Sequence, residues 1–174
     1  MPNKKTGAVM VVGGGNSAVT EALYLTGVAG KVYLTHRRDN LRADDVLKKR
    51  LLESKVEILW KSQVRSIEGD NVVQRVRVSE GEAGKERIVE VDGVFISIGE
   101  DPQSELAVKA GVETESNRYI RVNRRQETNV KGVYAAGDVV GGVRQIGTAV
   151  GEGITAAVNA YLYITGGWYG KEAK

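Results

Sequence analysis

Residues 8–42 read AVMVVGGGNSAVTEALYLTGVAGKVYLTHRRDNLR, and this stretch determines the expected fold. Its first five residues are apolar and mostly β-branched, which is the composition of a buried parallel strand. Three glycines follow, and then Ala18, Ala22 and Leu25 recur at helical spacing. Residues 31–35, KVYLT, have the composition of a second strand. The order of strand, glycine turn, helix and strand predicts a βαβ unit.

The glycine turn has the pattern G-x-G-x-x-A, which is typical of dinucleotide sites. Gly13 suits the tight turn, Gly15 lets a pyrophosphate approach the main chain, and Ala18 lets the helix lie close to the strand. We expect Asn16 or Ser17 to cap the helix, whose free N–H groups would face the phosphates. The pattern alone also suits an ordinary glycine turn, and the flanking strand and helix favour the dinucleotide site. The predicted pyrophosphate site comprises Gly13, Gly14, Gly15, Asn16, Ser17 and Ala18.

A basic run stands at the end of the second predicted strand, with His36, Arg37 and Arg38 in succession and Arg42 four positions further on. An NAD site usually places Asp or Glu here to bind the ribose 2′-hydroxyl. Arginine can bind two phosphate oxygens at once, so the run predicts a site for the 2′-phosphate of NADP. The alternative interpretation is that these residues form a solvated basic face.

Two strings in this stretch, GGGNSA and HRRDNLR, resemble the NADPH domain of the low-molecular-weight thioredoxin reductases. That family usually shows a glycine triplet with Asn-Thr-Ala and then HRRxxFR, so Ser17 and Leu41 are mild departures from its pattern. The resemblance implies a flavoprotein oxidoreductase that takes a hydride from NADPH to FAD and passes electrons to a disulfide. It implies no acid–base catalyst, because the two cofactors carry the chemistry.

Hydrophobic periodicity predicts the other elements of the first half. We expect a helix at 43–54, a third parallel strand at 56–60, a β-meander from runs at 63–68, 71–78 and 86–91, and a buried strand at 93–99. Pro102 would then turn the chain away from the sheet. The fold class is therefore α/β, with a nearly complete Rossmann-like NADPH domain, a parallel sheet plus the meander, over residues 1–98.

Residues 128–138, TNVKGVYAAGD, predict a turn and then a buried strand that ends at Gly137 and Asp138. A carboxylate at the end of a parallel strand lies where α/β proteins bind ligands, although such an aspartate can also cap a turn. The string GVYAAGD resembles a signature of flavoprotein disulfide reductases. This resemblance implies that Gly137 and Asp138 line FAD, and that Asp138 binds its ribityl chain.

An apolar helix is predicted to begin at Arg144-Gln145-Ile146 and to end near residue 164. Its glycines at 147, 151 and 153 weaken a helix, so we expect another segment to pack closely against them. The resemblance implies that Arg144, Gln145 and Ile146 lie beside the flavin. Residues 99–174 are then the C-terminal segment of an FAD-binding domain.

Cysteine is absent from all 174 residues, which excludes a redox-active C-x-x-C and a thiolate metal site. One histidine leaves little for a metal cluster. In the family, the FAD fold begins with its own G-x-G-x-x-G unit and the C-x-x-C precedes the NADPH motif; this sequence has neither. We therefore expect a fragment, or a subunit completed by another chain, that is inactive alone and exposes apolar surface at its apolar helix.

The charge balance, 25 basic against 22 acidic residues, indicates a mixed surface rather than a nucleic-acid-binding face. No apolar run approaches the ~20 residues of a membrane span, and the N-terminus lacks the apolar core of a signal peptide, so a cytoplasmic location is expected. The resemblance implies thioredoxin or a similar small disulfide protein as partner, and a homodimer. The alternatives are an NADP(H)-binding module or partner subunit without flavin, and a nucleic-acid binder that uses the basic run.

Overall fold

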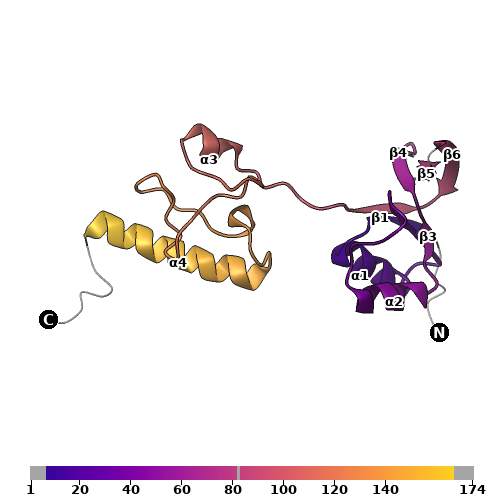
Figure 1. The fold of residues 1–174 in the computed structure, drawn as a ribbon, viewed down its shortest axis with the longest axis horizontal. Coiled ribbons are helices and arrows are strands. Elements are labelled where there is room, and N and C mark those ends of the chain that lie inside the picture. The colour runs from indigo at the N-terminus through magenta and orange to yellow at the C-terminus, as the bar shows by residue number, and fades with distance from the viewer. Residues whose placement is uncertain (1–6, 82, 167–174) are drawn as a thin grey trace. The chain divides into compact units, whose positions relative to one another are not determined.

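Residues 7–81 and 83–166 are described by a computed structural model, in which the chain separates into a unit Met1–Gly99 and a unit Glu100–Lys174 (Figure 1). A parallel sheet organises the first unit, with the strand order β3-β2-β1-β7. Its strands are β1 (Ala8–Gly13), β2 (Lys31–Thr35), β3 (Glu57–Leu59) and β7 (Gly93–Ser97). The carboxyl ends of these strands meet at one edge, where Gly13 lies opposite Ser97 and Val12 opposite Thr35.

Two helices, α1 (Asn16–Leu25) and α2 (Asp45–Leu52), cover one face of this sheet (Figure 1). An antiparallel sheet covers the other face and has the order β4-β5-β6. Its strands are β4 (Ser62–Glu68), β5 (Arg75–Glu80) and β6 (Lys85–Glu90). Val11 packs into the helix-side core and Met10 into the core beneath the second sheet, because successive side chains of a strand point to opposite faces. Burial on both faces explains why β1 is apolar throughout.

The edge strand β7 is more exposed than its apolar sequence predicts. Phe95 and Ile96 are 36% and 56% exposed, so the prediction of a buried strand was wrong for this part of β7. The reason is its place in the sheet, since β7 pairs with β1 alone and has no neighbour on its other side among the described residues. The predicted helix at 43–54 is shorter, at Asp45–Leu52, and only Leu51 of its apolar residues is fully buried.

The second unit contains α3 (Glu105–Lys109), the 3₁₀ turn η1 (Asp138–Val140) and α4 (Ile146–Thr165). The strand predicted to end at Asp138 does not form: across the described residues 100–166 the chain makes isolated bridges, such as Glu127 with Tyr134, and no ladder. A strand requires a neighbour for its backbone N–H and C=O groups, and in the described part of the unit this segment has only the single bridge from Tyr134 to Glu127. The prediction of a buried strand ending at Gly137 and Asp138 was therefore wrong for this chain.

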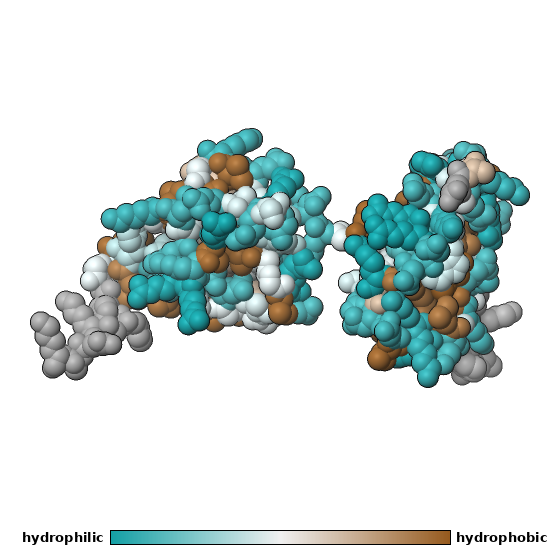
Figure 2. Space-filling model, in the orientation of Figure 1, coloured by the Kyte–Doolittle hydropathy of each residue, from teal (hydrophilic) through white to brown (hydrophobic). Residues whose placement is uncertain are grey.

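Helix α4 buries none of its twenty residues. Its exposed apolar residues recur at helical spacing, and include Ile146, Val150, Ile154, Val158 and Tyr161. Figure 2 shows brown, hydrophobic surface on both units of the molecule. The close packing expected at Gly147, Gly151 and Gly153 is not found among the described residues, because a Cβ at any of these positions would meet nothing within 4 Å.

Candidate functional site

The glycine loop, residues 13–15, joins β1 to α1, and its three members have different surroundings. A Cβ on Gly13 would collide with the Ser97 carbonyl oxygen and would lie 2.7 Å from the Cβ of Ala18. Gly13 and Ala18 must therefore be small for α1 to lie close to the sheet. A Cβ on Gly15 would meet nothing within 4 Å, so packing within the described chain does not require glycine there. The open space at Gly15 is what a bound pyrophosphate needs.

Helix α1 begins at Asn16 with Gly15 as its N-cap, and no side chain caps it. The prediction that Asn16 or Ser17 caps this helix was therefore wrong. The Asn16 side chain instead pairs with Asp44, to which its Nδ2 donates a hydrogen bond of 2.7 Å. Because no side chain of the described residues makes a capping hydrogen bond to the N-terminal end of α1, its first N–H groups and positive dipole end remain available to an anion.

The basic loop, residues 36–42, follows β2 and carries Arg37, Arg38 and Arg42 at the surface. No acidic group within the described residues forms an ion pair with any of these three guanidinium groups. Leu41 is only 4% exposed and anchors the loop in the core, and the Arg42 amide donates a hydrogen bond of 2.7 Å to the Gly14 carbonyl. The loop thus has an anchored main chain, and its three guanidinium groups form no ion pair within the described part of the chain.

His36 is the first residue of the basic loop and, unlike the three arginines, is buried, at 6% exposed. Its ring contacts Gly14, where a Cβ would collide with the imidazole, and its Nε2 lies 3.1 Å from the Asn40 carbonyl oxygen. Burial lowers the pKa of His36, with a smaller contribution from the positive charges of Arg42 and Arg38, although the carbonyls of Asn40 and Gly13 act in the opposite direction. The buried His36 ring therefore packs the basic loop against the glycine loop. Its direct contact with a phosphate stays a prediction.

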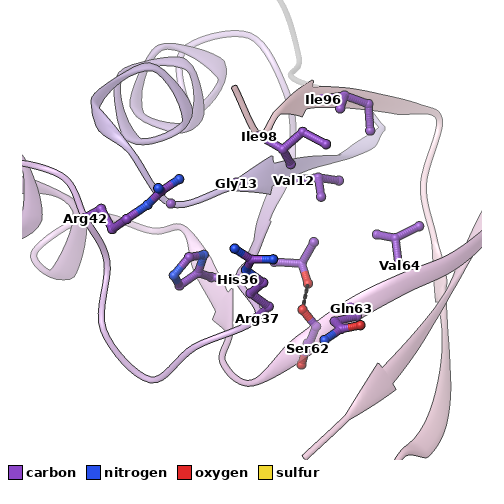
Figure 3. Close-up of a pocket in the computed structure, with 12 residues that line it drawn as sticks. Val12, Gly13, His36, Arg37, Arg42, Ser62, Gln63, Val64, Ile96 and Ile98 are labelled. Carbon is purple, nitrogen blue, oxygen red and sulfur yellow. Dashed lines mark hydrogen bonds between the residues drawn. The ribbon is translucent and has the colours of Figure 1, made fainter. Parts of the chain in front are cut away.

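A cleft of about 440 Å³ brings the glycine loop and the basic loop together (Figure 3). Its lining comprises Val12, Gly13, Gly14, Thr35, His36, Arg37, Arg42, Ser62, Gln63, Val64, Ile96 and Ile98. The Thr35 hydroxyl donates a hydrogen bond of 3.3 Å to the Ser62 carbonyl, which holds β4 beside the end of β2. The sequence analysis assigned no cleft residue to the meander, so the apolar lining and the contribution of β4 were missed. Only the order of the strands in space brings β4 to this edge.

A second cluster lies at the start of α4. A hollow of about 370 Å³ is lined by Asp138, Arg144, Gln145, Ile146 and Ala149, so four of the predicted flavin residues meet there. The Gly137 amide donates a hydrogen bond of 2.8 Å to Glu152, a residue that the sequence did not single out. These contacts place η1 against the first turns of α4.

Arg144 is already engaged within its own unit. Its Nε lies 2.6 Å from a carboxylate oxygen of Glu100, and its Nη1 donates a hydrogen bond of 2.5 Å to the Tyr119 hydroxyl. The Tyr119 hydrogen bond and the Glu100 charge raise the pKa of Arg144, so the guanidinium remains charged. A flavin contact by Arg144 would have to compete with these partners.

Comparison with known proteins identifies the family. The chain matches the model of the pyridine nucleotide-disulphide oxidoreductases over residues 2–153. The chain belongs to this family. Thioredoxin reductase from Bacillus subtilis (strain 168) is 43% identical over 159 residues, which cover 90% of the chain and 50% of that protein. A ferredoxin–NADP reductase from Symbiobacterium thermophilum is 39% identical over 171 residues, covering 96% of the chain and 51% of the relative.

Solved structures give the same result. Lactococcus lactis thioredoxin reductase in its FR conformation superposes with a TM-score of 0.75 at 36% identity, covering 95% of this chain and 55% of that one. The T. acidophilum enzyme has a TM-score of 0.72 at 33% identity, with coverage of 92% and 53%. The chain is thus similar to thioredoxin reductases and spans about half the length of the relatives it matches.

Other kinds of site are not found in the part of the chain that the structure describes. No group of three or more His, Asp or Glu side chains in residues 7–81 and 83–166 could hold a metal ion. Within the same ranges, none of the helices combines the length and the apolar character needed to span a membrane.

Proposed function

We propose that this chain binds NADPH in the cleft between the glycine loop and the basic loop. The observation that carries the proposal is the direct hydrogen bond of 2.7 Å between the Arg42 amide and the Gly14 carbonyl. It joins a loop suited to a pyrophosphate with a loop that presents unpaired cations. NADPH carries both a pyrophosphate and a 2′-phosphate. Because NADH lacks the 2′-phosphate, the positive charge of the basic loop favours NADPH over NADH.

Each part of the cofactor has its own residues in this proposal. The pyrophosphate lies at the N-terminus of α1, held by Gly13, Gly14, Gly15, Asn16, Ser17 and Ala18. Arg37, Arg38 and Arg42 hold the 2′-phosphate, and His36 supports them from below. The exposed guanidinium groups favour this assignment, because a doubly charged phosphate satisfies several of them at once.

We also propose the activity of the whole protein: a hydride passes from NADPH to FAD, and electrons then reach the disulfide of thioredoxin or a similar small protein. Residues 1–98 would form the NADPH domain, and residues 99–174 the C-terminal segment of the FAD-binding domain. NADPH supplies the hydride and FAD accepts it, so the residues of this chain bind and orient. The sequence has no cysteine, so the chain alone should not reduce a disulfide.

The flavin part of the proposal rests on the hollow at the start of α4. Asp138, Arg144, Gln145 and Ile146 all line it, which supports a shared ligand. The uncovered apolar side of α4 and the open space at its glycines support a further proposal, that the missing half of the flavin fold covers this helix. That half would come from another part of a longer chain, a second copy in a homodimer, or a complementing subunit.

The names of the relatives bear on the electron acceptor. Relatives of similar identity are named thioredoxin reductase and ferredoxin–NADP reductase, so residues shared with both do not select the acceptor. Thioredoxin or a similar disulfide protein is favoured by the larger number of thioredoxin reductases among the most similar relatives. A cytoplasmic location stays a prediction.

The visible absorption spectrum of the purified chain, recorded before and after NADPH is added, tests the proposal. A flavin band that bleaches with NADPH supports hydride transfer, and Asp138→Ala should then abolish flavin retention. A colourless chain that binds NADPH supports the alternative of an NADP(H)-binding module without turnover. A chain that binds neither NADPH nor flavin contradicts the proposal.

The nucleic-acid alternative needs its own test. The double variant Arg37→Glu, Arg38→Glu reverses two charges of the basic loop, so it should weaken NADPH binding strongly. RNA and DNA binding, measured in parallel by gel shift, should be negligible before and after the change. Loss of RNA or DNA binding with unchanged NADPH affinity would instead favour the hypothesis that the basic loop binds nucleic acid.

A further inference from the structure

Asn16 and Asp44 form a reciprocal pair of hydrogen bonds between the beginnings of α1 and α2. The Asn16 Nδ2 donates to a carboxylate oxygen of Asp44 at 2.7 Å, and the Asp44 amide donates to the Asn16 Oδ1 at 2.8 Å. Asn16 is the first residue of α1 and Asp44 is the N-cap of α2, and 28 positions separate them in the sequence. The pair therefore ties the beginning of α1 to the end of the basic loop.

The same region is held at a second point, two residues earlier. The Arg42 amide donates a hydrogen bond of 2.7 Å to the Gly14 carbonyl. Leu41 and Ala43, on either side of Arg42, are 4% and 3% exposed. The Arg42 main chain is thus fixed by the glycine loop before it and by Asp44 after it, while its side chain remains exposed. A cation on a fixed main chain loses less entropy when it binds an anion.

Neither residue of the pair follows its local preference. Asn and Asp are among the best helix caps, yet the side chain of neither Asn16 nor Asp44 makes a capping hydrogen bond to its own helix. Asp44 also places a negative charge two residues from Arg42, where it opposes anion binding. The geometry that the pair imposes on the two loops offsets the loss of a helix cap and the negative charge near Arg42.

We propose that Asp44, acting through Asn16, is a positioning residue that sets Arg42 for the 2′-phosphate and thereby determines selectivity for NADPH over NADH. This inference rests on the proposed function of the cleft as an NADPH site. Asp44 does not contact the cofactor in this proposal. It controls the spacing between the N-terminus of α1 and the cation that reads the 2′-phosphate.

Three variants of the full 174-residue chain test the proposal, with NADPH and NADH titrated separately by calorimetry. Asp44→Ala removes the hydrogen bond that the Asn16 Nδ2 donates to the carboxylate and leaves the one from the backbone amide of residue 44. It should weaken NADPH binding about 5- to 20-fold while NADH binding changes less than about twofold. Asp44→Asn keeps an acceptor oxygen and the backbone amide, and should retain the selectivity of the parent chain. Asp45→Ala is the matched control, because it removes the same charge one residue away and its only described partner is Lys48.

The comparison separates geometry from charge. All three variants lose one negative charge beside the basic loop, so a purely electrostatic effect would strengthen NADPH binding equally in each. The proposal would be overturned if Asp44→Ala and Asp45→Ala had the same ratio of NADPH affinity to NADH affinity. A parent chain that binds neither nucleotide would instead refute the proposed function on which the inference rests.

A fourth variant, Asn16→Ser, tests the proposal even if Asp44→Ala misfolds. Asn16→Ser preserves the backbone N–H at the start of α1 but shortens the side chain that reaches Asp44. It should lower the ratio of NADPH affinity to NADH affinity at least as far as Asp44→Ala does, because both hydrogen bonds of the pair use the Asn16 side chain. Combining the two changes should lower this ratio no further than Asn16→Ser alone. A ratio that falls additively in the double variant would contradict a shared role for the pair.

Discussion

The imidazole of His36 lies directly against the main chain of Gly14, so close that a side chain at position 14 would collide with it. This contact joins the glycine loop to the basic loop. The Arg42 amide joins the same two loops a second time by its hydrogen bond to the Gly14 carbonyl. The second glycine of the triplet is therefore explained by packing. The third glycine is not, because the space beside it is open.

The first prediction compares these two glycines. Gly14→Ala should destabilise the chain by about 1–3 kcal/mol, because the added methyl group overpacks against the His36 ring. Gly15→Ala should change the free energy of unfolding by less than about 1 kcal/mol, because its φ of −94° suits alanine and nothing lies within 4 Å. Chemical denaturation measures both. Equal destabilisation of the two variants would show that the space at Gly15 is closed.

Gly15→Ala should nevertheless weaken NADPH binding at least about tenfold, since the methyl group would occupy the space assigned to the pyrophosphate. Isothermal titration of the folded variant measures this effect. A stable Gly15→Ala chain with unchanged NADPH affinity would argue against the assigned position of the pyrophosphate.

The second prediction concerns pH. The folded pKa of His36 is lower than the ordinary value of 6.5, because burial disfavours the imidazolium. Below pH 6.5 the unfolded chain therefore takes up a proton before the folded chain does, so the free energy of unfolding should fall as pH falls through the window just below 6.5. Denaturation at a series of pH values checks this slope.

The single histidine of the chain makes this prediction easy to isolate. The imidazole proton signals in an NMR titration report the folded pKa directly. His36→Gln should remove the slope between pH 6.5 and 5, whereas losses below pH 4.5 should persist because they include carboxylates such as Glu68, whose pKa is lowered to about 2. An NMR pKa above 6.5 would contradict the prediction.

The third prediction tests the charge of the basic loop. Arg42→Ala should weaken NADPH binding by about 10- to 100-fold and leave the affinity for NADH nearly unchanged, because only NADPH has the 2′-phosphate. Arg50→Ala, an exposed arginine of α2 outside the cleft lining, is the matched control and should alter neither affinity. NADPH affinity of the parent chain should also fall as salt is added. Equal losses for both nucleotides would place Arg42 away from the 2′-phosphate.

The fourth prediction concerns the apolar side of α4. Ile154 is 61% exposed, and the chain should self-associate through this helix because exposed apolar patches favour contacts between molecules. Ile154→Ser together with Val150→Ser should reduce the average mass measured by light scattering. Ile88→Ser, at a residue 53% exposed on β6, is the control and should leave the mass unchanged. A monomeric parent chain would contradict the prediction.

Local sequence predicted the first half of the fold well. The predicted βαβ unit is confirmed, and β2 occupies Lys31–Thr35 as expected, because the glycine turn and the change of hydrophobic period lie within a few residues of each other. The meander is confirmed as well, because β4, β5 and β6 pair antiparallel, although the strand predicted at 71–78 occupies Arg75–Glu80. The family and the α/β class follow from these local patterns and agree with the solved relatives.

Features that depend on distant neighbours were predicted less well. The GVYAAGD segment has a strand composition but forms no ladder in the described chain, because composition does not supply a neighbouring strand. The exposure of Ile96 depends on β7 being an edge, which the apolar sequence of β7 does not reveal. The helix cap assigned to Asn16 was wrong because Asp44 competes for the same side chain.

The sequence by itself determined the chemistry of the candidate site: small residues where β1 meets α1, cations where β2 ends, and no cysteine anywhere. Only the tertiary structure decided how these parts are held. The parallel register places Gly13 and Thr35 at one edge of the sheet, and long-range contacts then bury His36, fix Arg42 and pair Asn16 with Asp44. The reason is that side-chain type is a local property, whereas a hydrogen bond between residues 28 positions apart exists only after the sheet has formed.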